Sequence, residues 1–142
     1  MNLTYFQNKV LKIISTKDNI FSIFLILIIF LLDRLSKFKA LEELSENVFY
    51  VNDFVNFDLV WNTGIGFGLF NSDSNLIYNS TSAIIALVII YLFYIGLKSE
   101  NADKFIFSII IGGALGNFCD RLVYKAVPDF IDFHFENFHW FT

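Results

Sequence analysis

The chain has 142 residues, of which 56% are hydrophobic, 19% aromatic and 17% charged, and its formal net charge is −4 at pH 7. This composition is typical of an integral membrane protein, with membrane lipids as partners, and it excludes the concentrated positive charge of a nucleic-acid-binding protein. The single cysteine, Cys119, excludes an intramolecular disulfide and a cysteine-based zinc site.

Three segments are long and apolar enough to cross a bilayer, which takes roughly 20 residues. The first covers residues 20–38 if the charged side chains of its DRLSK string reach the outer interface. It lacks the small-x-small cleavage site of a secretory signal, so we expect it to remain a helix. The second, residues 74–97, is uncharged, and the third covers residues 105–124. We therefore predict an all-α polytopic membrane protein, with residues 1–142 forming a single membrane-embedded domain.

The distribution of lysine in the short loops predicts the orientation of these spans. Lysines precede the first span and lie between the second and third, whereas residues 39–73 are mainly acidic (the lysines are Lys9, Lys12, Lys17, Lys98 and Lys104). We expect a cytoplasmic N-terminus, with residues 39–73 and the residues after Tyr124 outside. Asp33 and Asp120 then lie at the same outer membrane surface.

The external segment, about residues 39–73, contains the string NVFYVNDFVNFDLVWN. Its Val, Phe and Tyr residues alternate in part with polar ones, which predicts one or two short strands. The strands should end in a turn at Asn62, Gly64, Gly66 and Gly68. We expect a small β-rich extracytoplasmic segment on the membrane surface.

Asp120 lies near the end of the third span, in the string IIGGALGNFCDRL. An ionisable group at membrane depth costs several kcal/mol unless it faces a partner or a cavity, so Asp120 is a candidate functional residue. The simpler alternative is an exposed carboxylate paired with Arg121 or Lys125. Asp33 and Lys37 have the i, i+4 spacing of a helical ion pair.

Four strings resemble motifs of one enzyme family. DRLSK is similar to D-x-x-[ST]-K, WNTGIGFGLF to N-x-G-x-[AGS]-F, GGALGNFCDRL to G-G-A-x-G-N-x-x-D-R, and VPDFIDFHF to V-x-D-[FM]-[IL]-D. Together they resemble the lipoprotein signal peptidase family (signal peptidase II). These are membrane aspartic endopeptidases of the bacterial inner membrane, which cleave prolipoproteins before a diacylglyceryl-modified cysteine.

The resemblance implies a role for each matching residue. Asp120 matches the first catalytic aspartate, and eight other residues are expected to bind substrate or support the site: Asp33, Lys37, Asn62, Gly64, Asn117, Arg121, Asp129 and Asp132. The expected partners are prolipoproteins, met at the outer face of the membrane. Two carboxylates and a water suffice for this chemistry, so no cofactor and no metal are expected.

The family's second catalytic aspartate belongs to an F-N-x-A-D motif that opens a fourth transmembrane helix. This sequence ends at Thr142, before such a motif. It looks like a C-terminally truncated member, with the partner carboxylate expected beyond Thr142 and with Asp129 or Asp132 as alternatives. Two further alternatives are a catalytically incomplete fragment and a non-enzymatic lipid-binding membrane protein.

Two other sets of residues have simpler explanations. Gly112 and Gly113 are expected to let transmembrane helices approach closely, and Gly116 could serve both packing and the site. His134 and His139 could suggest a metal site or a general base. Their five-residue spacing, with no paired cysteine, instead favours packing at the membrane interface.

Overall fold

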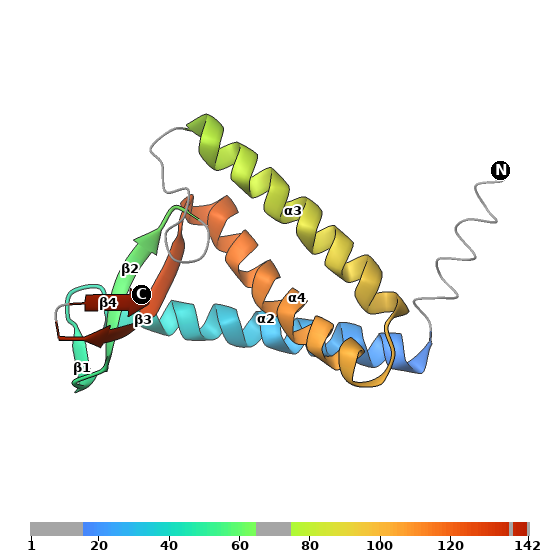
Figure 1. Ribbon diagram of the computed structural model, residues 1–142, viewed down its shortest axis with the longest axis horizontal. Helices are drawn as coiled ribbons and strands as arrows, with labels where there is room; N and C mark the ends of the chain where they lie inside the picture. The colour runs from blue at the N-terminus through green and yellow to red at the C-terminus, as the bar shows by residue number, and fades with distance from the viewer. Residues whose placement is uncertain (1–15, 65–74, 137, 142) are drawn as a thin grey trace.

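The computed structural model describes residues 16–64, 75–136 and 138–141. It contains three long helices, α2 (Lys17–Glu43), α3 (Asn75–Lys98) and α4 (Asn101–Tyr124), together with a small antiparallel sheet (Figure 1). The strands are β1 (Phe49–Asn52), β2 (Val55–Asn62), β3 (Val127–Phe135) and β4 (Phe138–Phe141). The predicted turn at Gly66 and Gly68 and the predicted helix start at Ser74 lie outside the described residues.

All three helices are long and apolar enough to cross a membrane, which confirms the three predicted spans. The first helix is longer than predicted, because residues 39–43 continue α2 and do not belong to the β segment. Its added turn buries Ala40 and carries an i, i+4 contact between Lys39 and Glu43. At the other end, Thr16 caps α2 by accepting a hydrogen bond from the Asn19 amide.

Helix α4 packs against both α2 and α3. A Cβ atom on Gly112 would lie 2.6 Å from the Cβ of Ile29, so glycine permits the close approach of α2, as predicted. At Gly113 an added Cβ meets no atom of the described residues within 4 Å, so no close helix approach is seen there. Buried hydroxyls of Ser22 and Ser108 are hydrogen-bonded across the α2–α4 interface.

The sheet combines strands from two distant parts of the chain in the order β1-β2-β3-β4. The sequence predicts strands only between the first two spans, whereas residues 127–135 and 138–141 also form strands. The alternation in VPDFIDFHF is typical of a strand, but Pro128 obscured it. Pro128 is tolerated because it lies in the part of β3 that pairs only with β2, opposite Trp61.

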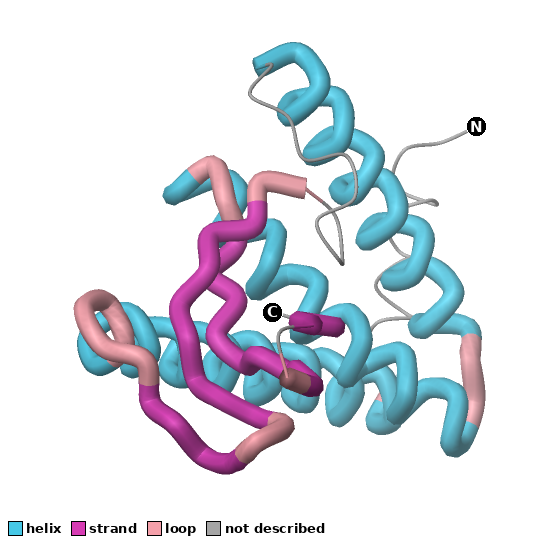
Figure 2. Tube along the Cα trace, turned by 60° about the vertical axis from the view of Figure 1, so that its left-hand side comes forward, coloured by secondary structure: helices cyan, strands magenta, loops and turns pink. Residues whose placement is uncertain are grey.

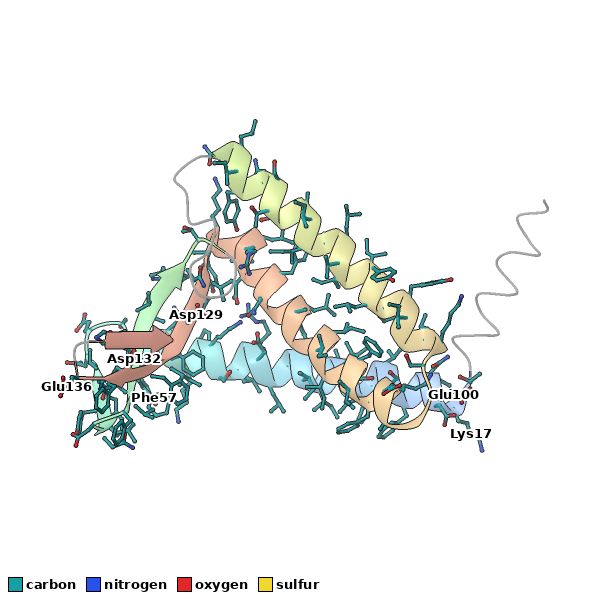
Figure 3. All side chains as sticks on the ribbon, in the orientation of Figure 1. Lys17, Phe57, Glu100, Asp129, Asp132 and Glu136 are labelled. Carbon is teal, nitrogen blue, oxygen red and sulfur yellow. The ribbon has the colours of Figure 1, made fainter. Side chains whose placement is uncertain are left out.

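The sheet lies at the end of the helices where α4 leads into β3 (Figure 2). Strand β3 contacts both α4 and α2, and the Trp61 ring packs edge-on against Tyr124 with centroids 5.5 Å apart. Figure 3 shows Asp129 and Asp132 in this region, whereas Lys17 and Glu100 lie at the opposite end of the helices. Most of the polar residues predicted from the sequence therefore come together at one end of the molecule.

Candidate active site

A network of buried and partly buried charges joins α2 to α4 at the sheet end of the helices. The Asp120 side chain has no exposed surface, and its carboxylate accepts hydrogen bonds from Arg34 and from Lys37, the latter with Nζ 2.8 Å from Oδ2. Lys37 also lies 2.9 Å from Asp33 Oδ1 and donates to the Asn117 side chain. Two carboxylates and two cations thus balance one another, with Asp120 and Lys37 buried and with Asp33 and Arg34 partly exposed.

We call this network the α2–α4 ion cluster (Asp33, Arg34, Lys37, Asn117 and Asp120). Helical spacing explains how it assembles. Residues three and four apart share one helix face, so the cluster residues of α2 project toward α4 and those of α4 project toward α2. Gly116 makes the contact possible, because a Cβ atom there would lie 2.0 Å from Oδ2 of Asp33. The alternative of an exposed Asp120 paired with Arg121 or Lys125 is therefore wrong.

Arg121 binds backbone carbonyls and holds the residues just after β2 against α4. Its guanidinium donates a 2.6 Å hydrogen bond to the Gly64 carbonyl and a 3.3 Å bond to the Asn117 carbonyl. The Arg121 carbonyl in turn accepts a 2.7 Å bond from the Tyr78 hydroxyl of α3. Arg121 thus connects α3, α4 and the residues that follow β2.

Asp129 lies at the start of β3, half-buried and next to the ion cluster. Its carboxylate accepts a 2.9 Å hydrogen bond from the Asn62 side chain, whose oxygen accepts a bond from the Gly64 amide. Burial raises the pKa of Asp129 above its ordinary value, although the Asn62 hydrogen bond and the positive charges of Lys37 and Arg121 oppose the rise. The negative charge of Asp120 adds to it.

Asp132 lies further along β3 and takes part in a different set of contacts. Its buried carboxylate lies 3.1 Å from Nδ1 of His134 and accepts a 2.9 Å hydrogen bond from Nδ1 of His139. These three residues could hold a metal ion, since their ligand atoms all lie within 4.8 Å of one another.

The structure thus brings together eight of the nine predicted site residues. Asp33, Lys37, Asn117 and Asp120 form the ion cluster, and Asn62, Gly64, Arg121 and Asp129 lie beside it. Sequence reasoning missed Arg34 and Tyr78. Arg34 was assigned to the lipid interface, although its i, i+3 spacing from Lys37 placed it on the same helix face. No sequence pattern singled out Tyr78.

A model of the signal peptidase (SPase) II family matches residues 25–142. The chain belongs to the signal peptidase II family. A lipoprotein signal peptidase from Pelagibacter ubique (strain HTCC1062) is 46% identical over 132 residues, which cover 91% of this chain and 80% of that protein. One from Thermodesulfovibrio yellowstonii is 43% identical over 84% of this chain and 77% of its own length.

The fold of this signal peptidase II family member is also similar to that of a solved bacterial membrane enzyme, determined by the in meso method at 2.3 Å resolution. The TM-score is 0.60 at 26% sequence identity, and the match covers 82% of this chain and 73% of that one. Sequence and fold therefore agree on a multi-pass membrane peptidase family that processes lipoproteins.

Proposed function

We propose that the protein is an aspartic endopeptidase that removes signal peptides from diacylglyceryl-modified bacterial prolipoproteins. Family membership and the relatives named lipoprotein signal peptidase support this activity. The observation that carries the chemistry is Asp129, a half-buried carboxyl group with a raised pKa beside a set of buried charges. Titratable groups perturbed by burial and by specific charged neighbours are typical of active sites.

The reactive carboxyl in this proposal is Asp129, whereas the sequence pointed to Asp120. Asp120 has no exposed surface, and its carboxylate contacts both Arg34 and Lys37. Asp129 is partly exposed, and Asn62 fixes its orientation. The contacts of Asp120 suit a positioning residue that holds α2 against α4, and those of Asp129 suit a group that exchanges protons.

The proposed reaction needs a second carboxylate, which the family resemblance puts in an F-N-x-A-D motif beyond Thr142. One carboxylate takes a proton from a water molecule while the other, still protonated, donates to the scissile carbonyl. Burial raises the pKa of Asp129, and this is the direction that a proton-donating carboxyl requires. Water oxygen adds to the carbonyl carbon. The C–N bond then breaks as the carboxyl that took the water proton passes it to the lipidated cysteine's amine, while the proton on the former carbonyl oxygen returns to the other carboxylate.

The charge distribution supports a substrate that arrives from the bilayer at its outer face. We propose that the N-terminus is cytoplasmic and that the sheet lies outside the inner membrane, as the distribution of lysine predicts. The helices expose large apolar side chains along their length, including Phe21, Leu31, Leu87 and Leu122. Such a surface is suited to lipid contact, so the acyl chains of a precursor can stay in the bilayer during cleavage.

Cleavage by matched asparagine variants of the full-length gene product tests the assignment. With reconstituted enzyme and a diacylglyceryl-modified precursor, Asp129→Asn should lower kcat by about 10³-fold or more, in line with the loss of a general acid or base. Asp53→Asn, an exposed carboxylate in the β1–β2 turn, serves as the matched control and should cleave normally.

The comparison with Asp120→Asn decides between the two aspartates. Per folded molecule, Asp120→Asn should retain at least about tenfold more activity than Asp129→Asn, because its role is to position the helices. The reverse order would make Asp120 the reactive group. No cleavage by the wild-type full-length protein would instead favour a non-enzymatic lipid-binding protein.

A further inference from the structure

Asp132, His134 and His139 form a second polar cluster in the sheet. Asp132 and His134 are two residues apart on β3, so their side chains lie on the same face of the strand. His139 lies directly opposite His134 in the β3–β4 register. The two imidazole rings have centroids 5.4 Å apart, and the carboxylate of Asp132 contacts Nδ1 of both.

The polar atoms of this cluster are not fully satisfied by one another. His139 Nδ1 is hydrogen-bonded to the Asp132 carboxylate, with distances of 2.9 and 3.0 Å to its two oxygens. His134 Nδ1 lies 3.1 Å from the same carboxylate but makes no well-directed hydrogen bond, and it is buried. A buried polar atom without a partner destabilises the folded protein, and a bound ion would remove this cost.

The spacing of the three ligand atoms suits a small divalent cation. Zinc binds imidazole nitrogen and carboxylate oxygen at about 2.0–2.2 Å in tetrahedral geometry, which separates neighbouring ligand atoms by roughly 3.3 Å. The Nδ1-to-oxygen distances here are 2.9–3.1 Å, so small side-chain rotations would make room for the ion. His139 is 56% exposed, which leaves a route for the ion and for a water ligand in the fourth position.

We propose that Asp132, His134 and His139 form a zinc-binding site that ties β4 to β3. The nitrogen and oxygen ligands favour zinc over calcium or magnesium, which prefer oxygen alone. The site would hold the β3–β4 hairpin closed three residues beyond Asp129 on the same strand. It revises the sequence-based expectation of histidine packing without a metal, and it stands whether or not the proposed peptidase activity does.

Metal analysis of the full-length protein tests this site, with a purification tag that contains no histidine. Each variant carries Cys119→Ser, which removes the thiol as a competing ligand. After chelation and dialysis against micromolar free zinc, the parent should retain one zinc per chain. His134→Gln and His139→Gln should each weaken binding by at least about tenfold. Glu136→Gln, the neighbouring exposed carboxylate, should bind like the parent.

Cobalt substitution in the same parent protein gives a readout that does not depend on the folding of a variant. Intense visible absorption typical of tetrahedral Co²⁺, removed by an equivalent of zinc, would support the site. Absence of both zinc and the cobalt spectrum in the parent would overturn the proposal. Undiminished zinc binding by both histidine variants would overturn it too, since the ion would then lie elsewhere.

Discussion

Asp120→Asn should destabilise the protein because it leaves two buried or half-buried cations without their shared carboxylate. Removing one partner of a buried ion pair costs about 3–5 kcal/mol. The lower end applies here, because the Arg34 side chain is 23% exposed and Lys37 keeps its 2.9 Å contact with Asp33. We expect the free energy of unfolding to fall by about 3 kcal/mol.

Equilibrium unfolding of the full-length protein in mixed micelles, followed by circular dichroism as the denaturing detergent increases, measures this change. Glu43→Gln is the control: it removes the exposed contact with Lys39 and should change stability by less than about 1 kcal/mol. The double variant Lys37→Met/Asp120→Asn should lose less stability than its two single variants do together. Its loss in the free energy of unfolding should be smaller than the sum of theirs by at least about 1 kcal/mol. If Asp120→Asn unfolded like the wild type, the ion cluster would not hold α2 against α4.

Three further predictions follow from the same contacts. Gly116→Ala should lower stability by about 1–3 kcal/mol because its methyl group would overlap Asp33, whereas Gly113→Ala faces open space and should be neutral in the same unfolding assay. Ionisation of Asp129 costs stability because burial raises its pKa above 3.8. The wild type should therefore lose stability relative to Asp129→Asn as pH rises from about 3.8 through the raised pKa, and the difference between the two should not change with pH below 3.8. Arg121→Lys should lower kcat/KM by tenfold or more in the precursor-cleavage assay, because lysine cannot bond two carbonyls in the same fork geometry; unchanged kinetics would show that this link is dispensable.

The helices were the most predictable part of the fold because their signal is local. A long uncharged run such as residues 74–97 leaves few alternatives to a membrane span, and α3 covers Asn75–Lys98. The end of the first helix was not predictable in the same way. Residues 39–43 are charged and follow the apolar run, yet helical propensity and the Lys39–Glu43 contact extend α2 through them.

The sheet could be predicted only in part because its pairing is non-local. The alternation in residues 47–62 indicated β1 and β2, but β3, which pairs with the other edge of β2, follows two helices later in the chain. The strand signal of β3 was weakened by Pro128, which is acceptable only because no strand pairs with that edge. Register between distant strands is set by tertiary packing, which a single sequence does not display.

In the candidate site, too, local patterns were predictable and contacts between distant residues were not. Motif residues such as Lys37, Asn117 and Arg121 were found, because their helical spacing and family pattern could be read directly from the sequence. Their individual contacts could not: Arg121 binds the Gly64 carbonyl, and Arg34 neutralises Asp120. A sequence shows which residues are neighbours along the chain, whereas the role of each site residue depends on which helix faces pack together.

Product analysis of precursor cleavage tests the central claim most directly. The full-length wild-type protein, reconstituted in lipid with a diacylglyceryl-modified precursor, should release a signal peptide whose mass places the cut immediately before the lipidated cysteine. Asp129→Asn should give neither product under the same conditions. Cleavage at that bond by Asp129→Asn at the wild-type rate would contradict the account.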